Sequence, residues 1–381
     1  MDFALTEEQQ MVREMAARFS EAEIRPKAAE LDESHAHPAD IINQLGELKM
    51  LGIAVPEEYG GGGMDYVSYV LALIEVSKGC ASTGVIMSVN NSLYCFPVYA
   101  YGTEAQKMKY LKPCASGEYL GCYGLTEAGA GSDPAGMRTT AVKDGDQWII
   151  NGEKKFITNG NVARYAVIAA VTDKEKGYKG ISTFVVDREN TPGFKVGRVE
   201  EKMGILASGT AELIFEDARL PADALLGKEG EGFKQMLTTL DGGRIGIASQ
   251  AIGIGRSVLE DSVEYARTRE QFGKPISAFQ AIQWKLADMA TELDAAELLT
   301  LRAAWLEDHK KPYEKAAAMA KMYASDAAMR ASVEGVQILG GYGYSKEYPM
   351  ERHMRDAKIC QIYEGTNEIM RLVVAKNLIK G

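Results

Sequence analysis

The chain has 381 residues, of which 46% are hydrophobic and 25% are charged. These proportions are typical of a folded globular protein and exclude a disordered or fibrous one. The length is too great for a single compact core or a small disulfide-stapled module, and predicts two or three domains. The 43 basic and 53 acidic side chains give a net charge of −10. No broad basic surface is therefore available for phosphates, and we expect no nucleic-acid partner.

The beginning of the chain shows no sign of a targeting segment. Residues 1–8 lack the basic head and the apolar run of a signal peptide, and nowhere is there an uncharged apolar run of membrane-spanning length, about 18 residues. We therefore expect a cytoplasmic protein that does not enter a membrane.

The cysteines and histidines do not suggest a metal site. The five cysteines are odd in number and have no Cys-x-x-Cys spacing, so we interpret them as small buried hydrophobic residues. His35 and His37 lie in an acidic loop bounded by proline. We expect no bound metal.

Residues 1–120 are expected to form a helical domain. Thr6 and Gln9 have the spacing of a capping box, and apolar residues then recur at helical spacing as far as Pro26, where we expect the helix to end. The pattern remains helical to about residue 120. We expect breaks at residues 56–63, which include four consecutive glycines, and around Pro97.

Residues 121–230 are expected to form a central β domain, a barrel or sandwich. Short runs rich in β-branched residues alternate with turn signals, among them Asn151-Gly152 and residues 191–193. The runs are residues 147–150, 165–171, 181–187 and 211–215. No helical pattern separates them, so a parallel sheet with crossover helices is disfavoured.

Residues 231–381 return to the helical period, and we expect a four-helix bundle. One apolar face steps by three and four through Phe279, Ile282, Leu286, Met289, Leu293 and Ala296. Residues 244–255, RIGIASQAIGIG, resemble a dinucleotide-binding loop, but no strand precedes them and the third glycine is missing. Close helix packing explains these small residues better.

Two segments contain residues that could carry chemistry. Because no metal-ligand set, nucleophile elbow or Walker loop is present, a cofactor is the natural expectation. Residues 123–133, YGLTEAGAGSD, combine glycines, which let the backbone approach a ligand, with hydroxyl and amide groups that can bind a pyrophosphate or a flat ring. The same residues could equally form a glycine-rich turn between domains.

The second segment is Tyr363-Glu364-Gly365, where a carboxylate stands beside a glycine in otherwise apolar surroundings. Desolvation would raise the pKa of such a carboxylate, which suits a general base that works near neutrality. A solvated glutamate at a helix start is the simpler alternative.

Over essentially its whole length, the chain resembles the acyl-CoA dehydrogenase family. The two halves of the family signature are residues 123–133 and residues 337–369, QILGGYGYSKEYPMERHMRDAKICQIYEGTNEI. Between them, and in the family's order, are KFITNG (155–160), LDGGRIGIASQA (240–251) and RTREQFGKPISAFQ (267–280). Residues 81–94, ASTGVIMSVNNSLY, look most like the short-chain, butyryl-type branch.

The resemblance implies a fold and a cofactor. The family combines an N-terminal helical domain, a central β domain and a C-terminal four-helix bundle, binds FAD between the β domain and the bundle, and forms a homotetramer as a dimer of dimers. By position, the residues implied at the flavin and pyrophosphate are Tyr123, Leu125, Thr126, Ser132, Phe156, Ile157 and Thr158. Those implied at the adenosine diphosphate end, across a subunit boundary, are Arg269, Phe272, Gln280, Gln337, Gly340 and Gly341, with Thr366 and Glu368 completing the site.

The resemblance also implies the reaction, an α,β-dehydrogenation of an acyl-CoA thioester with electrons passed to electron-transfer flavoprotein. Glu364 matches the base that removes the α proton, and its backbone N–H, together with a ribityl hydroxyl of the flavin, matches the donors to the thioester oxygen. Some members carry the base at the position of Gly243, where glycine cannot serve. The implied substrate-binding residues are Ser132, Asp241, Arg244, Tyr363 and Gly365, although Arg244 could be merely an ion-pair partner.

Substrate choice is less defined. The glutaryl-CoA branch places an arginine at the position of Gly84, so we expect a short, uncharged acyl chain. Asn90 and Asn91 could lie near the pocket or could be capping residues in a buried turn, and branched, cyclic or aromatic acyl groups remain open.

Two further classes are alternatives. One is an acyl-CoA oxidase or a flavin-dependent monooxygenase on the same fold, and the other is a non-catalytic acyl-CoA-binding or scaffold protein. Retention of Glu364 and of the flavin signature argues against the non-catalytic class.

Overall fold

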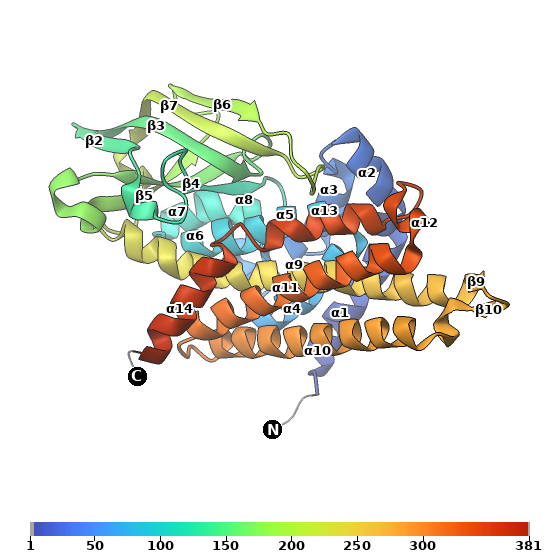
Figure 1. Ribbon diagram of the computed structural model, residues 1–381. Coiled ribbons are helices and arrows are strands. Elements are labelled where there is room, and N and C mark those ends of the chain that lie inside the picture. The colour runs from blue at the N-terminus through green and yellow to red at the C-terminus, as the bar shows by residue number, and fades with distance from the viewer. Residues whose placement is uncertain (1–3, 380–381) are drawn as a thin grey trace.

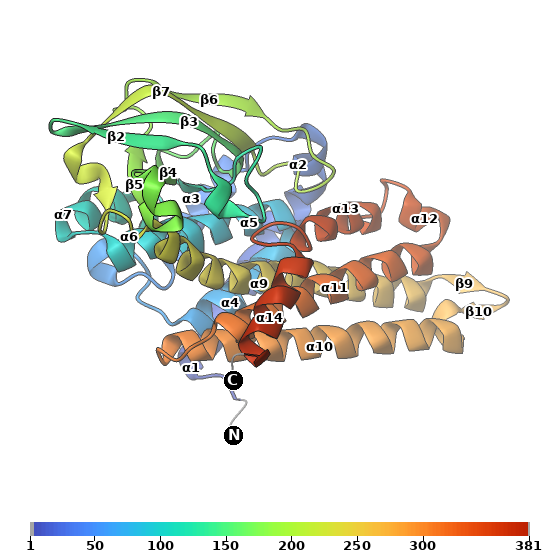
Figure 2. The ribbon, with the colours of Figure 1, turned by 60° about the vertical axis from the view of Figure 1, so that its left-hand side comes forward.

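The computed structural model describes residues 4–379 (Figure 1). Met1 to Phe3, part of the N-terminal segment considered above, lie outside the described residues. A helical N-terminal part, a β-sheet and a set of long C-terminal helices follow one another along the chain, as expected. The strands gather over one end of the long helices, and the N-terminal helices lie partly beneath the strands and partly beside them (Figures 1 and 2).

The first helix has the predicted start but not the predicted end. Helix α1 (Glu7–Phe19) begins at a capping box, in which Thr6 Oγ1 accepts from the Gln9 N–H and the Gln9 side chain accepts from the Thr6 N–H. The helical path then continues through η1 (Ser20–Ile24), η2 (Arg25–Lys27) and α2 (Ala28–Ser34). Pro26 therefore does not end it: Pro26 stands in the first turn of η2, where a missing N–H is tolerated. The left-handed His35 ends the helix instead.

The remaining N-terminal elements bury an apolar core between them. They are α3 (Ala39–Glu47), η3 (Met50–Gly52), η4 (Glu57–Tyr59), α4 (Tyr66–Gly79), α5 (Ala81–Ser88), η5 (Val89–Cys95), α6 (Phe96–Tyr101), α7 (Glu104–Gln106), η6 (Lys107–Leu111) and α8 (Lys112–Ala115). The break predicted at residues 56–63 is present before α4. The break predicted at Pro97 is wrong, because Pro97 occupies the first turn of α6 and helical structure runs into it from η5.

The strands form one eight-stranded, mainly antiparallel sheet. They are β1 (Gly121–Gly124), β2 (Thr140–Asp144), β3 (Gln147–Thr158), β4 (Tyr165–Val171), β5 (Ile181–Asp187), β6 (Phe194–Val199), β7 (Thr210–Pro221) and β8 (Leu225–Leu226). Their order is β6-β7-β3-β2-β4-β5-β8, with β1 beside β4. Only short 3₁₀ turns separate strands here: η7 (Pro134–Gly136), η8 (Lys174–Gly180) and η9 (Ala222–Ala224). Parallel pairing occurs between β1 and β4 and at Thr140–Val171.

Asn151-Gly152 is not the hairpin turn that its sequence predicts. Both residues lie inside β3, and the turn before that strand is at Gly145-Asp146. The register of β3 against β7 shifts between Ile150 and Gly152, where the φ of Gly152 is 139°. The dipeptide supplies a β-bulge in a long strand, which is the other structure that a glycine with positive φ permits.

The C-terminal helices form the expected bundle. They are α9 (Gly232–Thr268), α10 (Gln280–Asp308), α11 (Glu314–Leu339), α12 (Gly341–Tyr344), α13 (Met350–Cys360) and α14 (Asn367–Ile379). Between α9 and α10 lie β9 (Glu270–Gln271), β10 (Lys274–Pro275) and η10 (Ile276–Ala278). On α10, Met289, Leu293 and Ala296 are buried. All of residues 244–255 are buried within α9, so close packing is the correct interpretation of that segment.

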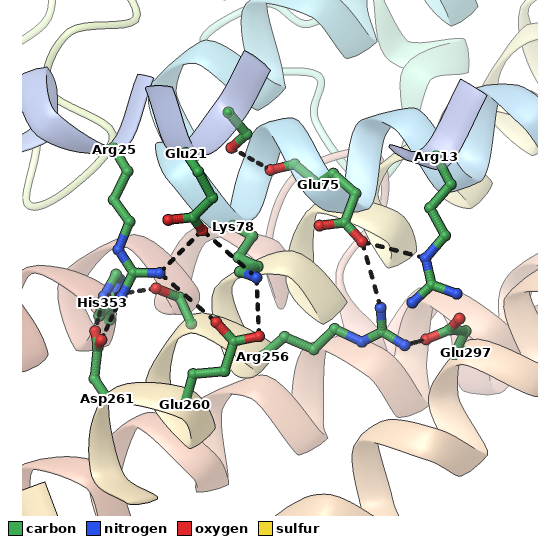
Figure 3. A network of polar contacts seen from close by, with 12 residues as sticks. Arg13, Glu21, Arg25, Glu75, Lys78, Arg256, Glu260, Asp261, Glu297 and His353 are labelled. Carbon is green, nitrogen blue, oxygen red and sulfur yellow. Dashed lines mark hydrogen bonds and ion pairs between the residues drawn. The ribbon is translucent and has the colours of Figure 1, made fainter. Parts of the chain in front are cut away.

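A network of charged side chains joins the N-terminal helices to the bundle (Figure 3). Glu75 of α4 contacts Arg13 of α1 and Arg256 of α9, while Lys78 reaches Glu260 at 2.9 Å. Further members of the network are Glu21, Arg25, Asp261, Glu297 and His353. Because Glu75 is buried, its two arginine partners compensate a charge that would otherwise be costly. The network fixes the position of α9, which carries part of the site described below.

No helix within the described residues is long and apolar enough to cross a membrane. Across the same residues, no group of three or more His, Cys, Asp or Glu side chains could hold a metal ion. All five cysteines are free, and all but Cys80 are buried.

Candidate active site

The turn that carries Glu364 connects α13 to α14 and lies in the bundle. Glu364 has a φ of 54° and Gly365 a φ of 99°, so the chain reverses through two residues in the left-handed region. The Asn367 N–H closes the turn by donating to Gln361 O at 3.0 Å. A non-glycine residue in this region is strained and is held only by its surroundings.

The carboxyl group of Glu364 lies against α9. Its Oε2 atom is buried and has no hydrogen-bond partner within residues 4–379. A Cβ atom on Gly243 would lie 2.0 Å from that oxygen, so glycine at this position leaves room for the carboxyl group. Burial raises the pKa of Glu364 from its ordinary value of 4.5 to about 8, against the opposing charges of Lys321 and Arg244. The group can therefore exchange a proton near neutral pH, unlike a solvated glutamate at a helix start.

Asp241 and Arg244 lie on α9, and the charge of Arg244 acts on this carboxyl group. They form an ion pair, and Arg244 is buried with an Nε atom that has no partner in the part of the chain the structure describes. Burial raises the pKa of Asp241 to about 6. Asp241 also lines a cavity of about 520 Å³, together with Phe233, Lys234, Leu237, Thr238 and Glu314. The ion pair thus exists, and one of its members faces space that a ligand can enter.

The structure brings the first group of expected flavin residues together at the ends of β1 and β3. Lys155 N–H donates to Thr126 O at 2.8 Å, which joins residues 123–126 to residues 156–158. The Tyr123 hydroxyl is buried without a partner among residues 4–379. Phe156 has a φ of 58° at a bulge of β3 and its side chain is 63% exposed. An unpartnered buried hydroxyl and an exposed, strained aromatic residue, carried by two joined segments, suit the binding of a flat ligand.

Three other expected flavin residues differ in how far their side chains are buried. The side chain of Ile157 is buried in the core of the sheet, so it offers a ligand only its backbone. Leu125 is buried, whereas Ser132 lies exposed in the loop that follows.

A buried ion pair, which the sequence did not reveal, supports the glycine-rich loop. Lys154 is fully buried and its Nζ contacts Glu127 Oε1 at 2.7 Å. Glu127 also accepts from the backbone N–H groups of Arg138 at 2.6 Å and Thr139 at 3.0 Å. The carboxylate therefore ties both ends of residues 127–139 to β3, which gives the loop a defined shape.

The second group of expected cofactor residues lies at the far end of the bundle, near α12 and the β9–β10 hairpin (Figures 1 and 2). Arg269, Gly340 and Gly341 line a cavity of about 550 Å³, and the Arg269 guanidinium lies 5.8 Å from the centre of the Tyr342 ring. Phe272, at the hairpin tip, is 93% exposed. Gln280 and Gln337 are also exposed. Within a single chain, these residues lie apart from the expected flavin residues at the ends of β1 and β3.

The remaining expected residues belong to the Glu364 turn or to the start of α14. The Tyr363 hydroxyl donates to Gln250 Oε1 of α9, and Gly365 O accepts from Lys321 of α11. Thr366 Oγ1 accepts from the Ile369 N–H at 3.4 Å, at the start of α14, and Glu368 is exposed on that helix.

Three family models match the chain in succession: "Acyl-CoA dehydrogenase, N-terminal domain" over residues 6–118, "middle domain" over residues 122–218 and "C-terminal domain" over residues 230–379. The chain belongs to the acyl-CoA dehydrogenase family. The resemblance inferred from the motifs is thus confirmed.

Among curated relatives, the short-chain specific acyl-CoA dehydrogenase of Bos taurus mitochondria is 53% identical over 99% of this chain and 91% of that protein. The short-chain specific acyl-CoA dehydrogenase of Clostridium acetobutylicum is 48% identical over 100% of both chains. The short-chain branch expected from residues 81–94 agrees with both relatives.

Solved structures agree over the whole chain. Butyryl-CoA dehydrogenase from Megasphaera elsdenii is 47% identical with a TM-score of 0.97, and covers 100% of both chains. A chain of "Electron transferring flavoprotein of Acidaminococcus fermentans: Towards a mechanism of flavin-based electron bifurcation" is 52% identical with a TM-score of 0.99, again over 100% of both. A glutaryl-CoA dehydrogenase from Mycobacterium smegmatis in complex with FADH2 is 36% identical with a TM-score of 0.93, over 99% of this chain and 96% of that one.

The side chains of Asn90 and Asn91, which were considered for substrate choice, are buried and hydrogen-bonded to the backbone. Asn90 Nδ2 donates to Leu51 O and Cys114 O, and its Oδ1 accepts from the Gly121 N–H. Asn91 likewise bonds three backbone groups, those of Met50, Ile53 and Met87. Both residues stand in the helical segment η5 and not in a turn, but their bonds to backbone groups favour the structural interpretation.

Gly84 is also explained by packing. A Cβ atom there would lie 2.1 Å from Ser77 Oγ of α4. A side chain at this position would require Ser77 to move, so close packing of α4 and α5 accounts for the glycine, and the absence of arginine does not by itself define the acyl group.

Proposed function

We propose that this acyl-CoA dehydrogenase catalyses the FAD-dependent α,β-dehydrogenation of a short-chain acyl-CoA thioester to the trans-2-enoyl-CoA, with Glu364 as the base that removes the α proton. The observation that carries the proposal is the buried, unpartnered Glu364 Oε2 on a strained turn. The names of the relatives from Bos taurus, Clostridium acetobutylicum and Megasphaera elsdenii support the short acyl chain.

The carboxyl group suits proton abstraction because its ionised form is not stabilised by hydrogen bonds. A pKa of about 8 matches a base that must accept a proton near neutrality and later release it. The backbone N–H of Glu364 donates to no group within the described chain, so it is free to hydrogen-bond a thioester oxygen as negative charge develops there. Asp241 and Arg244, beside the cavity of about 520 Å³, would position the CoA arm and keep the carboxyl group oriented.

The residues present fit FAD. Tyr123, Thr126, Ser132, Phe156 and Thr158 would hold the flavin, and Arg269, Phe272, Gln280, Gln337, Gly340 and Gly341 of a neighbouring subunit would hold the adenosine diphosphate end, with Thr366 and Glu368. When bound, FAD supplies the acceptor for the hydrogen that leaves the β carbon as hydride. The chain's own residues orient the thioester, exclude water and take the α proton at Glu364.

The proposal extends to partners and location. A second subunit is required because the two groups of cofactor residues lie apart in one chain (Figures 1 and 2). Exposed apolar residues on α10 and α14, including Trp284 at 64% and Leu372 at 64%, support the homotetramer. Electron-transfer flavoprotein as the acceptor is supported by the relative from Acidaminococcus fermentans. The cytoplasmic location stays a prediction.

The test is stopped-flow bleaching of the flavin by butyryl-, hexanoyl-, isobutyryl-, glutaryl- and cyclic acyl-CoA thioesters. We expect butyryl-CoA to reduce it fastest, and Glu364→Gln to keep the yellow colour and thioester affinity while the reduction rate falls at least about 100-fold. Glu118→Gln, at an exposed position, is the control. Normal reduction of the Glu364→Gln flavin would show that another group is the base.

The acceptor is tested separately. We expect the reduced protein to reoxidise slowly in air and quickly with electron-transfer flavoprotein. Rapid peroxide formation would instead support an oxidase, and protein that cannot be reconstituted with FAD would support the non-catalytic class.

A further inference from the structure

Lys321 is a fully buried cation on α11 that stands next to the Glu364 turn. Along the helix its neighbours Ala317, Ala320 and Ala324 are buried as well, so the side chain leaves the helix on an apolar face. An ammonium group in such a place requires hydrogen-bond acceptors and a compensating charge.

Within the described residues, the acceptors of the Lys321 ammonium group lie in the turn that carries Glu364 and at the start of α14. Its Nζ donates to Gly365 O at 2.7 Å and to Asn367 Oδ1 at 3.0 Å. Gly365 directly follows Glu364, and Asn367 is the first residue of α14. The ammonium group therefore holds the chain immediately after the base.

Two further residues of α11 form hydrogen bonds with this turn and with the start of α14. Asp326 Oδ1 accepts from Gln361 Nε2 at 2.7 Å and from Asn367 Nδ2 at 2.7 Å, and Ser325 Oγ accepts from Asn367 Nδ2 at 2.9 Å. Glu364, with its φ of 54°, thus lies in a turn whose two ends, Gln361 and Asn367, are both hydrogen-bonded to α11. Such a backbone conformation persists only where the surroundings impose it, and α11 supplies those contacts.

The titratable and charged groups around Lys321 come from its own helix and from three further parts of the chain. Glu364 and Cys360 face it from the turn and α13, Arg244 from α9, and Asp326 from its own helix. Burial lowers the pKa of Lys321 to about 8, and Glu364 opposes this shift. In return the Lys321 charge lowers the pKa of Glu364, which burial raises. Loss of the ammonium charge must therefore make the carboxyl group harder to ionise.

We propose that Lys321 is a positioning residue of the base: its ammonium group anchors the strained Glu364 turn to α11 and supplies, together with Arg244, positive charge near the carboxylate. The inference rests on the proposed role of Glu364. It assigns Lys321 no contact with the substrate.

The test compares Lys321→Met, Lys321→Gln and Lys321→Arg. The matched control is Arg330→Met, which removes one positive charge from an exposed position on the same helix. Each protein is examined as the FAD-loaded enzyme, by the pH dependence of flavin reduction by butyryl-CoA. A second measurement does not depend on turnover. Infrared difference spectroscopy follows the titration of the Glu364 carboxyl group, and the band that disappears in Glu364→Gln identifies its signal.

We expect Lys321→Met to move both titrations toward alkaline pH by about one unit, the size of effect that a nearby opposite charge exerts, and to lower the limiting rate. Lys321→Gln, which keeps a donor for Gly365 O, should show the same shift, while Lys321→Arg and Arg330→Met should keep the parent titration. If Lys321→Met does not fold, Lys321→Gln decides. Folded Lys321→Gln that titrates like the parent overturns the inference, whereas a parent enzyme that no acyl-CoA bleaches overturns the proposed function instead.

Discussion

Replacing Glu364 by glutamine should stabilise the protein, and increasingly so as the pH rises. In the folded chain the pKa of this carboxyl group is raised from 4.5 to about 8 by burial. The folded state therefore holds a proton that the unfolded state releases. The stability associated with that proton is fully present below pH 4.5 and is lost as the pH rises toward 8. The glutamine amide does not ionise in either state, so the variant does not lose this stability as the pH rises.

The size of the effect follows from the difference between the two pKa values. Proton linkage gives a gain in the free energy of unfolding of about 1 kcal/mol at pH 5 and about 3 kcal/mol at pH 7. The gain at pH 7 is lowered by the hydration that the amide also loses on burial. Lys321 loses an attractive charge but keeps its hydrogen bonds to Gly365 and Asn367. The rise of the gain with pH is therefore the stronger signature.

The assay is urea unfolding of the FAD-loaded protein at one fixed protein concentration, repeated from pH 5 to pH 8. Glu118→Gln, an exposed replacement of the same kind, should follow the parent at every pH. A constant difference between Glu364→Gln and the parent over this range would refute the reasoning, since it would mean that the carboxyl group does not change its protonation on unfolding.

Two further predictions concern the same carboxyl group. The rate of flavin reduction should rise about tenfold per pH unit below a midpoint near pH 8 and level off above it, because only the ionised base accepts the α proton; a pH-independent rate measured by stopped flow would contradict this. Gly243→Ala should reduce that rate at least about tenfold with little change in the melting temperature, because its Cβ would lie 2.0 Å from Glu364 Oε2 while alanine favours the helix; unchanged reduction would contradict the packing seen here.

Periodicity was sufficient to predict the sequence of helical, β and helical parts, because long amphipathic helices and alternating strands differ in their apolar repeat. It failed where one residue type serves two local structures. Pro26 and Pro97 each stand in a first helical turn, where proline is tolerated as well as it is beyond a helix end. Asn151-Gly152 forms a bulge in place of a turn, since both require positive φ.

The candidate site, too, could be predicted only in part from the sequence. Glu364 could be singled out because a lone carboxylate among apolar residues is conspicuous in a sequence. Lys321 could not, because a single lysine in an alanine-rich helix usually points to solvent. Its burial depends on α14 returning to α11 more than forty residues later, which is a tertiary contact with no local signal. The ion pair of Glu127 and Lys154 was missed for the same reason.

The close approach of Gly243 to Glu364 Oε2 has a consequence for comparing relatives. One region of space inside the bundle can be reached by an acidic side chain from either of two backbone origins, α9 or the α13–α14 turn, yet it accommodates only one such side chain. An ancestor could therefore have moved its proton acceptor from one origin to the other by paired substitutions without rebuilding the cavity. Alignments that inspect a single column would then misclassify active enzymes as inactive ones.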